Sequence, residues 1–176
     1  MNPWQSFEIE RRWLVQEPAK IRLQNLQSSH ITQTYLGYKG NHRIRERTYQ
    51  NHIEYTHTAK KKIKKGVSLE TEEIINKETY ENLLETRDNN RVTILKTRYL
   101  FHVGDTTLEI DSFHKPKQLW IVEIEYPTEE GLHSANILPS WLHIIEEITG
   151  NKQRSNSRMA LEGKNTLKTS DTTTPI

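Results

Sequence analysis

The first residues of this chain that could do chemistry are two carboxylates and a guanidinium in one short stretch. Glu8, Glu10 and Arg12 alternate with other residues between Phe7 and Val15. If this stretch is a β-strand, the three side chains share one face, because successive side chains point to opposite sides. Carboxylate oxygens suit Mg²⁺, which proteins commonly share with substrate phosphates. The stretch therefore favours a divalent cation that itself holds an anion, although one charged face on a half-exposed strand is also ordinary.

The same spacing of two charged residues returns in nearly every predicted strand. Each pair has a single sign, whereas a solvated strand face usually mixes signs. The acidic pairs are Glu8/Glu10, Glu70/Glu72, Glu109/Asp111 and Glu123/Glu125, and the basic pairs are Arg43/Arg45, Lys60/Lys62 and Lys96/Arg98. If the sheet closes, these pairs line a barrel that suits a polyanion with metal ions, since buried charge is costly unless it is paired or bound to ions. An open sheet with one solvated charged face is the alternative.

Eight strands and three helices are expected to carry these pairs. Strands are predicted at residues 7–15, 28–38, 42–49, 53–62, 67–75, 91–103, 106–113 and 119–126, and helices at 18–26, 76–87 and 141–148. Asn76 is a typical helix cap, and Gly150 is a typical residue just beyond a helix end. Short turns between most strands favour an antiparallel arrangement. We predict the α+β class, with an eight-stranded antiparallel β-barrel and flanking helices.

Length and composition narrow the classes of protein that fit. A chain of 176 residues is long enough for one domain with a real core. We expect that domain to span residues 1–162 and the polar residues 163–176 to form a disordered tail. The absence of cysteine excludes disulfides and thiolate sites, and the net charge of +2 makes a nucleic-acid partner unlikely. No segment has the length of a membrane span and no signal peptide is evident, so we expect a cytoplasmic protein without a membrane partner.

The charged motifs, taken in order, resemble the CYTH superfamily, also called triphosphate tunnel metalloenzymes. Glu8-Ile-Glu-Arg-Arg12 is similar to the family's opening Glu-x-Glu-x-Lys. The other similar motifs are Arg43-Ile-Arg45, Thr58-Ala-Lys60, Glu70-Thr-Glu72, Lys96-Thr-Arg-Tyr99, Glu109-Ile-Asp111 and Glu123-Ile-Glu125. Three positions depart from the family's pattern: Arg12 replaces a lysine, Ser68 replaces a basic residue, and Arg154-Ser-Asn156 stands where the family often has Tyr-x-Asn.

The resemblance implies a tunnel, open at both ends, in which Mg²⁺ or Mn²⁺ and basic side chains hold a triphosphate. The implied substrate-binding residues are Arg12, Arg43, Arg45, Lys60, Lys96, Arg98 and Lys152, the implied metal ligands are Glu8, Glu10, Asp111, Glu123 and Glu125, and the supporting residues are Glu70, Glu72 and Glu109. Among these, Glu8, Glu10, Lys96 and Arg98 are expected to act in catalysis. Arg12 is expected to grip phosphate, so that its loss costs activity and little stability. The remaining lysines of the run 60–65 are expected to form a solvated turn.

Three functions remain open at this stage. The family's triphosphatase branch implies hydrolysis of inorganic triphosphate or a related compound, such as thiamine triphosphate. A class IV adenylate cyclase would instead need an adenine pocket. A barrel that binds polyphosphate or RNA 5′-triphosphate ends without turnover is the third reading. No protein partner is implied, and the sequence leaves a homodimer open.

Overall fold

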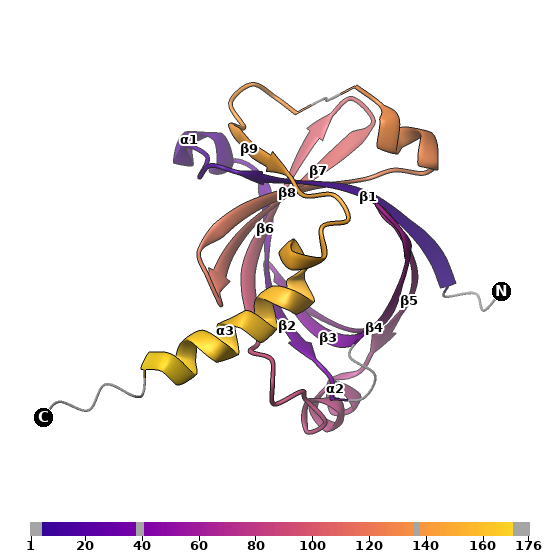
Figure 1. Cartoon of the computed structure of the whole chain (residues 1–176), viewed down its shortest axis with the longest axis vertical. Helices are drawn as coiled ribbons and strands as arrows, with labels where there is room; N and C mark the ends of the chain where they lie inside the picture. Colours follow the sequence, from indigo (N-terminus) through magenta and orange to yellow (C-terminus); the bar gives the residue numbers. More distant parts are fainter. Residues whose placement is uncertain (1–4, 38–40, 136–137, 171–176) are drawn as a thin grey trace, which may run out of the picture.

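Eight antiparallel strands close into a barrel in the computed structural model, which describes residues 5–37, 41–135 and 138–170, with side chains up to residue 164 (Figure 1). The strands are β1 (Gln5–Val15), β2 (Gln27–Tyr35), β3 (His42–Tyr49), β4 (His52–Lys64), β5 (Val67–Ile75), β6 (Ile94–Val103), β7 (Thr106–Lys115) and β8 (Leu119–Glu125). Their order around the barrel is β5-β4-β3-β2-β6-β7-β8-β1, and β1 pairs with β5 to close it. The predicted class and architecture are therefore confirmed.

Strand alternation sends the charged pairs inward and apolar residues outward. On β1, Arg12 lies opposite Glu123 of β8, while the intervening Trp13 lies opposite Val122 and is buried outside the barrel. The outer cluster around Trp13 packs under the segment that follows β8. It contains Trp13, Val15, Leu108, Ile110, Val122, Ile124 and Leu142. The hydrophobic core of this protein therefore lies largely around the barrel, and its interior is left to polar side chains.

Two of the predicted helices flank the barrel. Helix α2 (Lys77–Leu84) is capped by Asn76, whose Oδ1 accepts a hydrogen bond from the backbone N–H of Thr79 at 2.8 Å. Its Tyr80 packs with the outward-facing Ile44 and thereby covers β3 and β4. Helix α1 (Lys20–Leu23) is a single turn inside the predicted range. No helix in the described ranges is long and apolar enough to cross a membrane.

The predicted helix at 141–148 is wrong, because this segment contains strand β9 (Ile144–Glu147). The β4–β5 hairpin turns at Gly66, which has φ 72°. Strand β5 begins just after this turn, so its pairing with β1 extends only to Ile9. Strand β9 pairs with the edge of β1 that is left there. The backbone N–H of Ile148 then donates to the carbonyl of Arg12 at 2.8 Å. A short apolar run is compatible with a helix or a strand. Here it forms a strand because the edge of β1 offers backbone hydrogen-bond partners.

Helix α3 (Asn156–Ser170) lies across one mouth of the barrel (Figure 1). Tyr35, Phe113 and Ile121, which share the inward parity of their strands, form an apolar cluster with Met159 and Ala160 of this helix. This end is therefore apolar and covered, whereas the resemblance implied a tunnel open at both ends. The helix runs past residue 163, where a tail was expected. Residues 171–176 lie outside the described ones, and the domain boundary stays a prediction. Two short 3₁₀ helices precede α3: η1 (Glu129–His133) follows β8, and η2 (Lys152–Arg154) follows β9.

Candidate functional site

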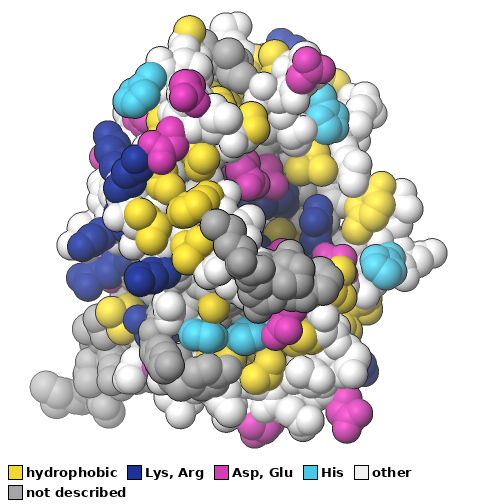
Figure 2. All heavy atoms as spheres, turned by 90° about the vertical axis from the view of Figure 1, so that its right-hand side faces the viewer, with side chains coloured by type: hydrophobic (Ala, Val, Ile, Leu, Met, Phe, Trp, Pro, Cys, Tyr) yellow, Lys and Arg dark blue, Asp and Glu magenta, His cyan; other side chains and the backbone are white. Residues whose placement is uncertain are grey.

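A charged cavity of about 280 Å³ lies within the barrel and under the segment that precedes α3. Its charged lining comes from the four strands β1, β3, β4 and β8 and from η2. These side chains are Glu8, Glu10, Arg12, Arg43, Arg45, Lys60, Lys62, Lys64, Glu123 and Lys152. Figure 2 shows a hollow on one face of the molecule in which acidic and basic side chains gather. The cavity suits a small ligand with several negative charges that is accompanied by a cation.

Two arginines of β3 form the basic wall. The guanidinium of Arg43 donates to Glu70 at 2.8 Å, so its charge is paired. Arg45 donates from Nε to the amide oxygen of Gln33 at 2.9 Å and lies 3.7 Å from Glu72. Burial, together with the neighbouring Arg43 and Arg98, lowers the pKa of Arg45 to about 10. The charge of Arg45 is therefore incompletely neutralised, which favours an anion beside it.

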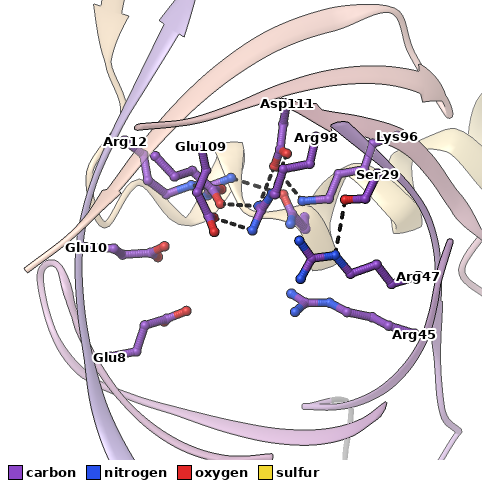
Figure 3. A network of polar contacts seen from close by, with 12 residues as sticks. Glu8, Glu10, Arg12, Ser29, Arg45, Arg47, Lys96, Arg98, Glu109 and Asp111 are labelled. Atoms are coloured by element: carbon purple, nitrogen blue, oxygen red, sulfur yellow. Dashed lines mark hydrogen bonds and ion pairs between the residues drawn. The ribbon is translucent and has the colours of Figure 1, made fainter. Parts of the chain in front are cut away.

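Two carboxylates of β1 face this basic wall. Figure 3 shows Glu8 and Glu10 reaching from β1 into the barrel, across from Arg45 and Arg47 of β3. Lys60 of β4 contacts Glu8 and lies 3.6 Å from Glu10. Burial raises the pKa of Glu10, and the nearby Glu8 and Glu123 raise it further, against the effect of Lys60. A further positive charge near Glu8 and Glu10 would therefore be favourable.

A buried ion-pair network forms the wall behind the cavity. Lys96 of β6 is 2% exposed and donates to Asp111 of β7, which is fully buried, at 2.5 Å. Arg98 donates to both oxygens of the same carboxylate at 2.7 Å. Burial and the neighbouring Arg98 lower the pKa of Lys96 to about 8. Burial alone would raise the pKa of Asp111, but Arg98 and Lys96 hold it below its ordinary value. The network pairs the bases Arg12, Lys96 and Arg98 with the carboxylates Glu109, Asp111 and Glu123, so its charges are close to balance.

Arg12 connects the barrel to the C-terminal segment that includes Thr149 and the start of α3. Its guanidinium donates to Glu123 at 2.8 Å and to the side-chain oxygen of Asn156, the first residue of α3, at 3.1 Å. The backbone N–H of Arg12 donates to Thr149 at 3.0 Å. These contacts make Arg12 part of the fold, because its removal would leave buried polar groups without partners. Its expected grip on phosphate stays a prediction.

The predicted site residues fall into two groups. Those on the cavity are Glu8, Glu10, Arg12, Arg43, Arg45, Lys60, Glu123 and Lys152. Those in the surrounding wall are Glu70, Glu72, Lys96, Arg98, Glu109 and Asp111, each of which lies within ion-pair distance of an opposite charge. Glu125 lies opposite Glu10 on β8, and its side chain is exposed. The structure thus brings the predicted residues to one place, while their individual roles stay predictions.

The carboxylates differ in how well they could receive a metal ion. Across the described ranges, no three acidic or histidine side chains are arranged to hold a metal together. Both oxygens of Asp111 and both of Glu123 already accept hydrogen bonds from basic side chains. Glu8 has a buried oxygen, Oε2, that contacts Lys60 without a well-formed hydrogen bond. Glu8 and Glu10 therefore fit a hard cation better than Asp111 and Glu123 do.

The sequence interpretation missed several polar residues of the site. Arg47 continues the inward row of β3 and donates to Ser29 at 3.1 Å. Lys62, already named with Lys60 as a basic pair, lines the cavity together with Lys64. Both side chains are exposed, as expected for the solvated run 60–65. The alternation that identified Arg45 and Lys60 extends by two residues to Arg47 and Lys62 and by four residues to Lys64, so the signal was present. Asn156 was noted only as part of a departure from the family's pattern.

Solved structures similar to this chain have the same barrel. "The crystal structure of the inorganic triphosphatase NE1496" is 29% identical, covers 88% of this chain and 94% of its own, and has a TM-score of 0.54. The PH1819 protein from Pyrococcus horikoshii OT3 is 19% identical over 70% of this chain and 80% of its own, with a TM-score of 0.56. A putative adenylate cyclase from Bacillus halodurans is 16% identical over 74% of this chain and 86% of its own, with a TM-score of 0.55. The last two show likeness of fold alone. No protein-family model matches the sequence, and no curated protein does.

Proposed function

Because the chain belongs to the CYTH superfamily of triphosphate tunnel proteins, we propose that it is a metal-dependent triphosphatase. The proposed reaction is hydrolysis of the terminal phosphate of inorganic triphosphate or a related triphosphate compound. The similarity to an inorganic triphosphatase at 29% identity over 88% of the chain supports this assignment. A class IV cyclase and a binding barrel without turnover are the outcomes against which it is tested.

One observation carries the proposal. Arg45 is a buried guanidinium whose pKa is lowered to about 10 by burial, Arg43 and Arg98, and it faces a cavity that also holds Glu8 and Glu10. A buried cation without a full counter-charge is costly, so the site favours an anion. Carboxylates across the same cavity repel an anion unless a cation accompanies it. A phosphate chain with a divalent ion satisfies both walls at once.

In the proposed mechanism, basic residues bind phosphate and acidic residues bind the metal ion. Arg43, Arg45 and Lys60 bind the phosphate chain, and Arg98 with Lys96 adds positive charge behind it. Glu8 and Glu10 would hold Mg²⁺ or Mn²⁺, which supplies charge neutralisation to the phosphate oxygens when it is bound. Hydrolysis places a water in line with the terminal phosphorus, breaks the bridging P–O bond and releases orthophosphate and diphosphate.

A product assay tests this function directly. The purified protein would be given inorganic triphosphate, ATP and thiamine triphosphate side by side, each with Mg²⁺, with Mn²⁺ or with EDTA. We expect orthophosphate release from inorganic triphosphate with either metal, and none with EDTA. Cyclic AMP and diphosphate from ATP would assign a cyclase. Tight binding of triphosphate without any product would assign a binding protein, and full activity in EDTA would exclude the metal.

A further inference from the structure

Two histidines and a glutamate form a row on the outer surface of the barrel, away from the cavity. His57 of β4 lies opposite Glu73 of β5, and its neighbour in the diagonal direction is His42 of β3. Their side chains point outward, because the residues that alternate with them, Arg43 and Thr58, lie on the inner face. A pair of neighbouring histidine side chains next to an acidic one is visible on the face drawn in Figure 2.

The three side chains of this row lie within hydrogen-bond distance of one another in sequence, from His42 through His57 to Glu73. Nδ1 of His42 lies 3.1 Å from Nε2 of His57, and Nδ1 of His57 lies 3.0 Å from a carboxylate oxygen of Glu73. The two rings are stacked, with centroids 5.3 Å apart and an angle of 26° between their planes. A carboxylate oxygen only accepts hydrogen bonds, so Nδ1 of His57 carries a proton. In the neutral ring, Nε2 of His57 therefore presents its lone pair to His42.

From this geometry we propose a divalent transition-metal site, with His42 Nδ1 and His57 Nε2 as its protein ligands. Two imidazoles bound at about 2.0–2.1 Å to a tetrahedral ion place their nitrogens roughly 3.3 Å apart. The observed separation is 3.1 Å, so the two nitrogens are already near the required distance, and the rings need only turn so that both lone pairs point to an ion beside the line that joins them. His42 then keeps its proton on Nε2 instead of Nδ1. Water supplies the remaining ligands.

The position of Glu73 supports this assignment. A histidine that ligates a metal commonly donates its other ring N–H to a carboxylate, which orients the ring and makes it a stronger ligand. His57 already has this arrangement with Glu73. Imidazole nitrogens suit Zn²⁺, Cu²⁺ and Ni²⁺, whereas Mg²⁺ prefers oxygen ligands. The site would tie together three strands that carry Arg43, Arg45 and Lys60 on their inner faces.

Zinc titration of the full-length protein tests the site. Binding would be followed by calorimetry in excess Mg²⁺, which occupies the carboxylates in the barrel, and by the shift in melting temperature. We expect one Zn²⁺ per chain. We expect loss of that binding in His42→Ala and in His57→Ala, and retention in His102→Ala, a control in which an exposed histidine on β6 is removed. Glu73→Gln should weaken binding by roughly 10- to 100-fold.

Copper provides a second readout that identifies the ligands. The electron paramagnetic resonance spectrum of bound Cu²⁺ should show two imidazole nitrogens in the natural protein and one or none in His57→Ala. Unchanged Zn²⁺ affinity in both His42→Ala and His57→Ala would overturn the proposal. So would loss of the zinc site in Glu8→Gln with retention in His57→Ala, since the ion would then lie inside the barrel. Neither outcome bears on the proposed triphosphatase activity, which is measured separately.

Discussion

At the scale of single residues, two arginines on the same cavity have different surroundings. Arg12 is satisfied by Glu123 and by Asn156, which makes it part of the structure. Arg45 has one neutral hydrogen-bond partner in Gln33 and a carboxylate, Glu72, at 3.7 Å. Both side chains line the cavity, so both are available to a ligand. We therefore expect Arg12 to contribute to both ligand binding and stability, and Arg45 to contribute mainly to ligand binding.

Replacing each arginine by alanine separates these contributions. Arg45→Ala should lower kcat/KM roughly ten- to a hundredfold, since a charge-assisted hydrogen bond contributes about 1.5–3 kcal/mol and about 1.4 kcal/mol is tenfold. Its melting temperature should change little, because relief of repulsion from Arg43 and Arg98 offsets the lost bond to Gln33. Arg12→Ala should also destabilise the fold by about 1–3 kcal/mol. Thermal melts and steady-state kinetics of both variants check this. A stability loss in Arg45→Ala equal to that of Arg12→Ala would contradict the distinction.

The lowered pKa of Lys96 predicts a pH dependence. Below about pH 8 the ammonium carries a charge and attracts the substrate anion, and above that value it is neutral. Because kcat/KM reports the ionisation of the free enzyme, kcat/KM should fall as the pH rises through about 8. Lys96→Met removes the titrating group, so its lower kcat/KM should lose this alkaline decline. The same decline in the variant would show that another group, or the substrate, is responsible.

At the scale of elements, β9 and the segment after it hold α3 to the barrel. Strand β9 continues the sheet along β1 beyond the turn at Gly66. Thr149, the second residue after β9, accepts a hydrogen bond from the backbone N–H of Arg12 at 3.0 Å and donates to Glu147 at 2.9 Å. This element places Lys152 at the cavity and Asn156 beside Arg12. A strand that was not predicted thus positions two residues of the site.

Thr149→Val tests how far this element depends on one hydroxyl. Valine has the same shape and leaves the buried N–H of Arg12 without its acceptor, so the free energy of unfolding should fall by about 1–3 kcal/mol. Thr149→Ser keeps the hydroxyl and should recover most of that loss. Urea denaturation of the three proteins measures the difference. Equal stability of the valine variant and the natural protein would mean that this bond contributes little.

At the scale of the whole molecule, the barrel keeps its charges inside and its apolar residues largely outside. The ion pairs of the wall hold the strands in register, but Arg45 and Glu10 both have a shifted pKa, which indicates incomplete compensation. A ligand that supplies the missing charges should therefore stabilise the molecule as a whole. The apolar cluster beneath α3 keeps one mouth of the barrel out of this charged region.

Ligand-induced stabilisation follows from this arrangement. Inorganic triphosphate with Mg²⁺ at about one hundred times its Kd should add about 2.7 kcal/mol, which raises the melting temperature by roughly 5–10 °C for a domain of this size. Mg²⁺ alone should have a smaller effect. Arg45→Ala should show a reduced shift at the same concentrations. A thermal-shift series with orthophosphate, diphosphate and triphosphate measures this, and an absent shift with triphosphate would contradict the binding site.

The spacing of the charged residues was enough to assign them to shared strand faces, because alternation along a strand is local. Glu8, Arg45 and Lys96 were therefore assigned to one inner surface from their spacing, and Asn76 was identified as a helix cap. Only the tertiary structure decided which partner each charge has, since the pairing depends on how the barrel closes. Arg12 meets Asn156 across 144 positions of the sequence, and His42 meets His57 only through the register of β3 and β4. The change of residues 144–147 from an expected helix to a strand has the same cause. Strand β5 begins only after the turn at Gly66, which leaves the edge of β1 beyond Ile9 available to β9.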